Sequence, residues 1–389
     1  MDYKLLSEVS VYRKDRIGSD KVNKENYIST ENMLSNRGGV ENATTVASAK
    51  TFPAYKKGDI LLSNIRPYFK KIWYATQEGG CSNDVLVVKA GKTVDSKFLY
   101  YVLSDNNFFN YSTVTSKGTK MPRGSKNAIM KYWVPDLDFP TQKKIADILS
   151  SYDDLIEANN RRIELLEQTA QELYKEWFVR FRFPGYENTK FENGLPEGWK
   201  IKRMNEFCYV TDGTHDTPNP VDVGVPLVTG RCISSGFVDF DAAYNISEAD
   251  HKGIKKRSGL KSGDILFSNI GTVGNCCIVD YDREFSVKNV IIFKPETMRD
   301  TAYLYYWMTS STMQEIFGAQ TNGASQQFVG LTFMRRYKLL VPKDDILEAF
   351  ADKVLPIVEQ KRLLHQKNLN LVAQRDMLLP RLMSGKLEV

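Results

Sequence analysis

Long apolar runs and regularly spaced cysteines are both missing from this chain of 389 residues, and each absence excludes a class of protein. No apolar run reaches the ~18 residues that a membrane-spanning helix needs, so we expect no membrane partner. The opening Met1–Lys4 lacks the basic and then apolar pattern of a signal peptide. The five cysteines include no C-x-x-C pair, which favours reduced thiols over disulfides or zinc and predicts a cytoplasmic protein.

Motifs that carry chemistry are also missing. The chain has no G-x-G-x-x-G and no phosphate-binding G-x-x-x-x-G-K-[ST], since the nearest text, Gly118–Ser125, has the wrong spacing and order. The three histidines stand far apart without Cys or carboxylate partners at metal-ligand spacing, so we expect surface or capping roles for His215, His251 and His365. The sequence therefore predicts a protein that is not an enzyme, with no catalytic residue, no metal and no cofactor of its own.

The chain does contain an internal sequence repeat. Gly58–Ile65 returns 205 residues later as Gly263–Ile270, with one substitution in eight positions. A period of this length indicates a duplicated domain rather than a solenoid repeat. Asp59 and Asp264 recur in a Gly-Asp turn before a strand, so we favour a turn role over acid–base chemistry. Two similar domains suggest a target with two similar halves, such as duplex DNA read at two half-sites. The net charge of +6 is compatible with this partner but not diagnostic.

Each repeat begins with a mixed segment of short strands and one helix. The helix is predicted over 96–110 in the first copy and over 301–317 in the second. In the first copy, apolar runs bounded by Gly, Asn and Pro predict strands at 59–62, 71–74 and 84–88. The expected divisions are 1–138 for the first domain, 139–183 for a long helix, 184–342 for a linker and the second domain, and 343–389 for a second long helix.

Each repeat ends in a long segment whose apolar residues alternate four and three positions apart, which is typical of a coiled coil. Lys361 and Arg375 interrupt the second seam, and we expect their stems to cover apolar surface. Antiparallel pairing of residues whose numbers add up to 527 sets Asn159 against Asn368 and apolar against apolar residues. Parallel pairing would instead bury each amide against hydrocarbon. A buried Asn pair is a register device, and the alternative that both amides point to water stays open.

Two loops in each repeat carry basic or amide side chains, and Gly118 and Gly323 keep the geometry of the second loop. Lys and Arg neutralise phosphates, whereas Arg, Asn and Gln also pair with base edges. The alternative is that these are ordinary solvated loops. The candidate DNA-binding residues are Asn64, Arg66, Lys70, Lys117, Thr119, Lys120, Arg123 and Lys126 in the first domain, and His215, Arg231, Asn269, Thr272, Asn322, Ser325, Gln326 and Gln327 in the second.

Over its whole length the chain resembles the specificity subunit of type I restriction-modification systems. Pro140–Leu149 resembles the opening of the family's first central helix, and Gly194–Trp199 the start of its second recognition domain. Asp212–Pro218 and the doubled Gly-Asp-Ile-Leu also resemble sequence motifs of this family. The lead-in to the second central helix departs from the family, because Pro342–Leu347 replaces the usual Pro-Pro-Leu followed by Glu-Gln. This departure leaves the start of that helix open, but not its existence.

The resemblance implies an α+β fold: two similar α/β target recognition domains joined by two long antiparallel coiled-coil helices, with an internal pseudo-twofold repeat. It implies that each domain reads one half of a bipartite, asymmetric double-stranded DNA target, that the helices set the spacer, and that S-adenosylmethionine binds elsewhere. The implied partners are two DNA adenine methyltransferase (modification) subunits, which the helices dock, and restriction/translocase subunits. The alternative is a DNA-binding scaffold of a related defence or methylation complex without restriction. A fused catalytic domain and a coiled-coil scaffold without DNA binding are less favoured.

Overall fold

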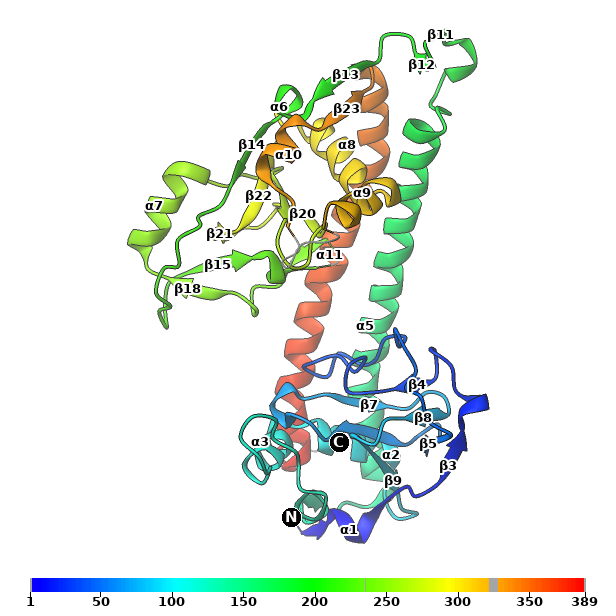
Figure 1. Cartoon of the computed structure of the whole chain (residues 1–389). Coiled ribbons are helices and arrows are strands. Elements are labelled where there is room, and N and C mark those ends of the chain that lie inside the picture. Colours follow the sequence, from blue (N-terminus) through cyan, green and yellow to red (C-terminus); the bar gives the residue numbers. More distant parts are fainter. Residues whose placement is uncertain (1, 235, 322–327, 388–389) are drawn as a thin grey trace. The chain divides into compact units, whose positions relative to one another are not determined.

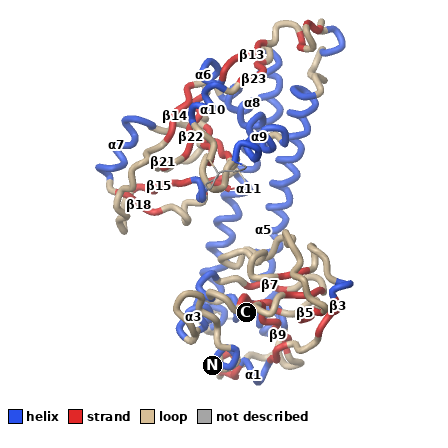
Figure 2. Tube along the Cα trace, in the orientation of Figure 1, coloured by secondary structure: helices blue, strands red, loops and turns tan. Residues whose placement is uncertain are grey.

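The chain forms two compact units. The computed structural model describes residues 2–234, 236–321 and 328–387 (Figure 1). Unit 1 comprises Met1–Asn160 and His365–Val389, and unit 2 comprises Arg161–Leu364. Each unit combines strands with helices, shown in red and blue in Figure 2. The α+β class and the duplicated layout predicted from the sequence are therefore confirmed. Within the described ranges, no helix has both the length and the hydropathy to cross a membrane.

The mixed domain of unit 1 contains ten short strands, three 3₁₀ or α-helical turns and three further helices among its described residues. In chain order these are β1 (Tyr3–Leu5), α1 (Leu6–Val9), β2 (Ser10–Tyr12), β3 (Arg16–Gly18), η1 (Ser19–Lys21), β4 (Tyr27–Ile28), β5 (Thr51–Tyr55), β6 (Ile60–Ser63), η2 (Pro67–Phe69), β7 (Ile72–Tyr74), β8 (Gly79–Cys81), β9 (Val85–Ala90), α2 (Ser96–Ser104), α3 (Asn106–Val114), α4 (Lys126–Ile129) and β10 (Trp133–Pro135). The strands form sheets β2-β9-β6-β7 and β3-β5-β8-β4 and the ribbon β1-β10.

The mixed domain of unit 2 repeats this frame. Its elements are η4 (Tyr186–Asn188), β11 (Phe191–Glu192), β12 (Leu195–Pro196), β13 (Lys200–Arg203), α6 (Met204–Phe207), β14 (Tyr209–Asp212), β15 (Val225–Thr229), η5 (Gly230–Cys232), β16 (Ile233–Ser234), β17 (Phe237–Val238), β18 (Tyr244–Ile246), α7 (Glu248–Ser258), β19 (Ile265–Ser268), β20 (Cys276–Ile278), β21 (Ser286–Lys288), β22 (Val290–Lys294), α8 (Met298–Thr309), α9 (Ser311–Thr321), α10 (Leu331–Arg336) and β23 (Lys338–Val341). The sheet β14-β22-β19-β20 has the order of β2-β9-β6-β7, and the ribbon β13-β23 matches β1-β10.

In each unit, the strand of the repeated sequence contributes side chains to two different apolar clusters, one on each of its faces. Ile60 and Leu62 of β6 join one apolar cluster of unit 1, whereas Leu61 between them joins another. In unit 2, Ile265 and Leu266 of β19 likewise enter different clusters. Successive side chains of a strand point to opposite faces, so a continuous apolar strand must be covered on both sides. The doubled Gly-Asp-Ile-Leu therefore encodes a central strand buried on both faces.

The turn before each of these strands is held by its aspartate, which confirms the predicted turn role. Asp59 accepts from Lys56 N at 2.7 Å, and Asp264 accepts from Lys261 N at 3.0 Å. The preceding glycines have φ of +89° and +88°, a region that favours residues without a Cβ. Each buried carboxylate also has a cationic partner that the sequence did not reveal, Arg13 for Asp59 and Lys294 for Asp264.

The predicted single helix of each domain is wrong, because each is two helices with a break at an equivalent position. Asp105 separates α2 from α3, and its side chain accepts from Asn107 N to cap α3. Ser310 lies 205 residues later and separates α8 from α9. Asp and Ser compete for backbone hydrogen bonds, so they favour a new helix start over a continuous helix. The prediction rested on the spacing of apolar residues, which continues through both positions and therefore did not reveal the breaks.

The two long helices pair antiparallel within each unit. Helix α5 (Phe139–Tyr174) has 36 residues and continues into a π-helical turn, η3 (Lys175–Val179), and α11 (Asp344–Met383) has 40 residues. In unit 1, Asn159 Nδ2 donates to Asn368 Oδ1 at 2.8 Å. This confirms the predicted antiparallel pairing of residues whose numbers add up to 527. In unit 2, the rings of Trp177 and Phe350, which have the same sum, lie 5.9 Å apart.

Candidate nucleic-acid interface

The two basic loops that the sequence singles out in the first domain lie side by side in unit 1. One follows β6, at residues 64–70, and the other connects α3 to α4, at residues 115–125. Arg66 N donates to Pro122 O at 2.8 Å, and Gly124 N donates to Asn64 O at 2.9 Å. An isolated β-bridge joins Ile65 to Arg123. Two clusters whose nearest ends, residues 70 and 115, are 45 residues apart therefore form one surface, which we call loop pair 1.

The second of these loops presents its cations to solvent. Lys117 and Arg123 exchange two backbone hydrogen bonds of 2.8 and 2.9 Å, which close a small hairpin with Gly118 in the left-handed region at φ +94°. Lys117, Thr119, Lys120 and Lys126 are exposed. Arg123 is also exposed and pairs with Asp84 at 3.2 Å, so part of its charge is neutralised within the protein. The exposed lysines of this loop suit the phosphate contacts predicted for them.

The equivalent loops of unit 2 meet in the same way. Val329 N donates to Asn269 O at 3.0 Å, which repeats the Gly124–Asn64 bond at an offset of 205 residues. A β-bridge joins Ile270 to Phe328, as Ile65 joins Arg123. We call this surface loop pair 2. Thr272 lies on it and bonds to Ser268 Oγ at 3.1 Å. The remaining candidates of this loop, Asn322, Ser325, Gln326 and Gln327, lie outside the described residues.

Asn64 and Asn269 occupy equivalent positions and are both buried, with exposures of 8% and 7%. Among the described residues, neither side-chain Oδ1 has a hydrogen-bond partner. Asn269 Nδ2 donates to Val329 O at 3.3 Å. The structure therefore buries both side chains at the junction of their two loops rather than at the surface that a base edge reaches, and the Asn269 side chain holds one loop against the other.

The other two candidates of unit 2 lie apart from each other. Arg231 is exposed beside loop pair 2, since its neighbour Gly230 accepts from Thr272 Oγ1 at 3.3 Å. His215 is exposed and bonds to Asp212 and Asn289, at 2.9 Å each. In the described part of the chain, neither of these His215 contacts reaches loop pair 2. The direct DNA contacts of all these residues stay predictions.

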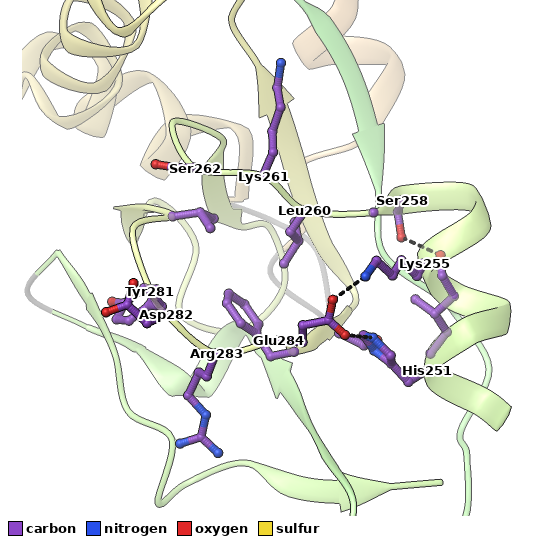
Figure 3. Close-up of a pocket in the computed structure, with 15 residues that line it drawn as sticks. His251, Lys255, Ser258, Leu260, Lys261, Ser262, Tyr281, Asp282, Arg283 and Glu284 are labelled. Atoms are coloured by element: carbon purple, nitrogen blue, oxygen red, sulfur yellow. Dashed lines mark hydrogen bonds and ion pairs between the residues drawn. The ribbon is translucent and has the colours of Figure 1, made fainter. Parts of the chain in front are cut away.

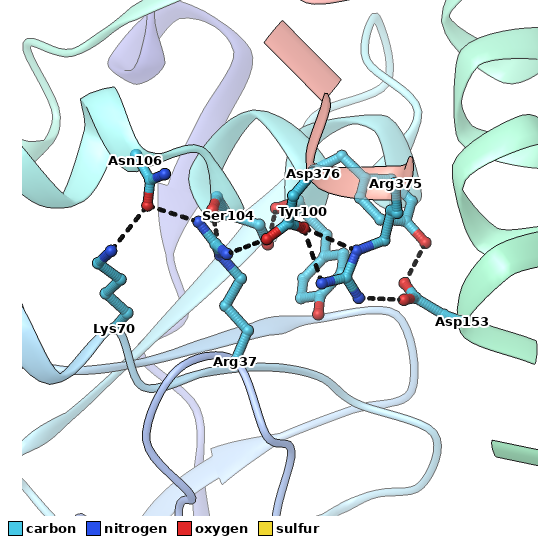
Figure 4. A network of polar contacts seen from close by, with 9 residues as sticks. Arg37, Lys70, Tyr100, Ser104, Asn106, Asp153, Arg375 and Asp376 are labelled. Atoms are coloured by element: carbon cyan, nitrogen blue, oxygen red, sulfur yellow. Dashed lines mark hydrogen bonds and ion pairs between the residues drawn. The ribbon is translucent and has the colours of Figure 1, made fainter. Parts of the chain in front are cut away.

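A polar network links loop pair 1 to the long helices within unit 1 (Figure 4). Lys70 Nζ and an Arg37 amino group both donate to Asn106 Oδ1, at 2.8 and 2.7 Å. Arg37 also pairs with Asp376 of α11 at 3.1 Å, next to the Arg375–Asp153 ion pair between α11 and α5. The predicted phosphate contact Lys70 is therefore connected to the helix seam through Asn106 and Arg37.

The two cations that interrupt the seam of α11 have acidic partners on α5. Arg375 pairs with Asp153 in unit 1, and Lys361 pairs with Glu167 in unit 2, where Lys361 is 5% exposed. Asn368 also donates to Asn160 at 2.8 Å, so a third amide joins the register contact. Asp153, Glu167 and Asn160 were not predicted from the sequence, because their partners lie 222, 194 and 208 residues away. The antiparallel pairing at a residue-number sum of 527 does point to them. It sets residue 166 against Lys361 and residue 152 against Arg375, and each acid is the next residue along α5.

A pocket of about 300 Å³ opens in unit 2 beside α7 (Figure 3). His251 lies at its wall and is buried, which corrects the surface role expected for it. Its ring bonds to Ser286 Oγ at 2.9 Å and to Glu284 at 3.1 Å. Hydrogen bonds from Lys255 and then His251 hold the pKa of the Glu284 carboxyl below its ordinary value. His251, Lys255, Glu284 and Ser286 thus satisfy one another. No group of three metal-binding side chains occurs in the described ranges.

Comparison with known proteins finds the same architecture. A family model for the type I restriction modification DNA specificity domain matches residues 6–168 and again residues 196–372. The chain is 27% identical over 372 residues to the MjaIX specificity subunit of a type I restriction enzyme from Methanocaldococcus jannaschii, covering 90% of this chain and 81% of that protein. It is 23% identical over 406 residues to the HindI specificity subunit from Haemophilus influenzae, covering 86% and 87%.

The fold is also similar to the crystal structure of a type I restriction-modification S subunit from M. genitalium. The TM-score is 0.56 at 15% identity, with 98% of this chain and 95% of the other covered. Both copies of the family domain fall on the two repeats that the sequence shows. The chain therefore belongs to the family of type I restriction-modification specificity subunits.

Proposed function

We propose that this specificity subunit reads a bipartite, asymmetric DNA target, one half through loop pair 1 and the other through loop pair 2. The observation that carries the proposal is that one loop frame is built twice, with the same backbone bond from Gly124 to Asn64 and from Val329 to Asn269. The side chains on the two frames differ, because Arg66 and Lys120 have no cationic counterpart in Gly271 and Ser325. A shared frame with different side chains suits two different half-sites.

We further propose that the helix pair sets the spacer between the half-sites and docks two methyltransferase subunits, to which restriction/translocase subunits are added. Both helices are long enough to exceed the ~34–36 Å of one DNA turn, at ~1.5 Å per residue. Both also carry large apolar side chains away from their seam, which is typical of surfaces that bind other proteins. These exposed residues are Ile148, Leu155 and Leu165 on α5 and Leu363, Leu369, Val372 and Met377 on α11.

We propose that the subunit acts in the cytoplasm. All five cysteines are free and buried, and burial raises the pKa of the Cys81 thiol to about 12. Thiols in this state resist oxidation and suit a reducing compartment.

Replacing Lys117, Lys120 and Lys126 by alanine should weaken DNA binding by the assembled complex and reduce its dependence on salt. Each lost phosphate contact lowers the slope of log affinity against log salt by ~0.9. The measurement is DNA binding across a salt series. A matched control changes Lys56, Lys57 and Lys92 to alanine, which are exposed near the opposite ends of strands β6 and β9. Equal slopes in the two triple variants would remove loop pair 1 from the interface.

The isolated chain should neither methylate nor cut DNA, with or without S-adenosylmethionine, because the sequence contains no cofactor-binding or catalytic motif. The measurement is transfer of a labelled methyl group to DNA by the purified chain. Addition of the methyltransferase subunits should restore transfer at the bipartite target. Transfer that survives rigorous removal of those subunits would contradict the proposed division of labour.

A further inference from the structure

One corner of unit 1 holds four non-glycine residues in the left-handed backbone region. These are Asn36, Arg37, Arg66 and Lys70, with φ of 55°, 63°, 50° and 53°. The corner is closed by hydrogen bonds from Asn36 N to Phe69 O at 2.8 Å and from Arg37 N to Lys70 O at 2.9 Å. A Cβ makes this backbone region unfavourable, and residues held in it often mark functional sites. We call residues 36–37 and 66–70 the left-handed corner.

Unit 2 shows what the same turn looks like without this strain. Leu62 pairs with Ile72 at one end of the loop, as Phe267 pairs with Cys276 in unit 2. Counted from these strand ends, Arg66 corresponds to Gly271 and Lys70 to Gly274. Both glycines have positive φ, of 76° and 100°. The frame therefore needs a left-handed backbone at these two points but no side chain. Unit 1 places a cation at each point where glycine relieves the strain.

The cations of the corner differ in how the protein uses them. Arg37 has a structural role, because it donates to Ser104 O at 2.6 Å as well as to Asn106 and Asp376 (Figure 4). Lys70 donates to the neutral amide of Asn106, and Arg66 lies 5.9 Å from the ring of Phe69. Within the described ranges, neither Arg66 nor Lys70 forms an ion pair, and Arg66 Nε is buried without a hydrogen-bond partner.

The corner is continuous with the exposed hairpin of loop pair 1. Arg66 N donates to Pro122 O, one residue before the end of the Lys117–Arg123 hairpin. Two cations without an acidic partner thus stand beside the cations of the hairpin. Their chemistry fits an anion spread along a line, as the phosphates of a DNA strand are.

We propose that Arg66 and Lys70 bind phosphates of the DNA strand at the first half-site, and that unit 1 keeps a strained backbone in order to place them. The second half-site lacks these two contacts, because unit 2 has Gly271 and Gly274 there. The inference rests on the proposed function and adds a specific asymmetry to it. Unit 1 carries more of the salt-dependent binding, and Arg66 and Lys70 add two contacts to the difference that the hairpin lysines make.

The test compares R66G, K70G and N36G in the assembled complex. All three substitutions relieve left-handed strain, so each should raise the melting temperature by roughly 1–4 °C. R66G and K70G should each lower the salt slope by ~0.9, whereas N36G keeps the wild-type slope. The loss of affinity should be equal on the cognate target and on DNA with an altered first half-site, because phosphates carry no sequence. R66K should retain the wild-type slope without the gain in melting temperature.

Four results would overturn the inference. Wild-type slopes for R66G and K70G, in a complex that still prefers its target, would overturn this inference alone. A loss confined to cognate DNA would assign Arg66 to base reading instead of phosphate binding. A lower melting temperature for R66G, beside a higher one for N36G, would make the Arg66 side chain structural. A wild-type complex without sequence preference would overturn the proposed function, and this inference with it.

Discussion

Exchange of unit 1 for that of another family member should give a chain that recognises a new first half-site and keeps its second half-site. The physical reason is that each unit has its own apolar clusters and its own loop pair. Methylation at the old target should disappear, because each mismatched base pair costs ~1–3 kcal/mol and several mismatches add up. Sequencing of methylated adenines in cells that carry the complete complex measures both half-sites. A change in both half-sites would show that the two domains do not read independently.

The position of the junction should decide whether this chimera is stable. Ile145 and Leu149 of α5 and Leu379 and Leu382 of α11 belong to the core of unit 1. A junction at residue 138 leaves these four side chains against a foreign core, where each misfit costs ~1–3 kcal/mol. A graft that carries 1–160 and 365–389 together moves the complete core. Its melting temperature should therefore exceed that of the graft that ends at 138, which serves as the matched control.

Deletion of one heptad from both long helices should shorten the preferred spacer without unfolding the protein. Removal of 161–167 with 360–366 leaves the Asn159–Asn368 contact of unit 1 and the Trp177–Phe350 contact of unit 2 in register. It also removes both members of the Lys361–Glu167 ion pair. The helices shorten by ~10 Å, which is about three base pairs. Binding to DNA with a series of spacers measures the shift, and affinity for the original spacer should fall because the domains also rotate about the duplex.

Deletion of 161–167 alone is the control for the paired deletion. It shifts α5 by two turns against α11, so either the Asn159–Asn368 contact or the Trp177–Phe350 contact is lost. A misplaced large side chain costs ~2–5 kcal/mol, and several are misplaced at once, so the single deletion should unfold at least one unit. Thermal unfolding of the two deletion variants separates these outcomes. Full affinity of the paired deletion for the original spacer would contradict the role of the helices as a ruler.

Part of the candidate site could be located from the sequence, but its assembly could not. The basic hairpin with Lys117 and Lys120 is visible as a run of cations around a glycine, and the structure leaves both side chains exposed. The joining of this hairpin to the loop after β6 depends on a backbone bond between Asn64 and Gly124, 60 residues apart. The burial of Asn64 and the left-handed backbone of Arg66 depend on the same contact. Asn64 was predicted to contact DNA from its amide side chain alone, and its burial could not be seen without this long-range contact.

The sequence by itself determined the duplication and the antiparallel register of the long helices. Each of these follows from a spacing, either the offset of 205 residues or the alternation of four and three positions, and a spacing is preserved in any fold that the chain adopts. Only the tertiary structure decided which acid neutralises Lys361 and Arg375, where Asp105 and Ser310 break their helices, and which side chains around the loops are buried. These depend on groups that are distant in sequence and meet only when the strands and helices pack, because hydrogen bonds and ion pairs act over a few ångströms.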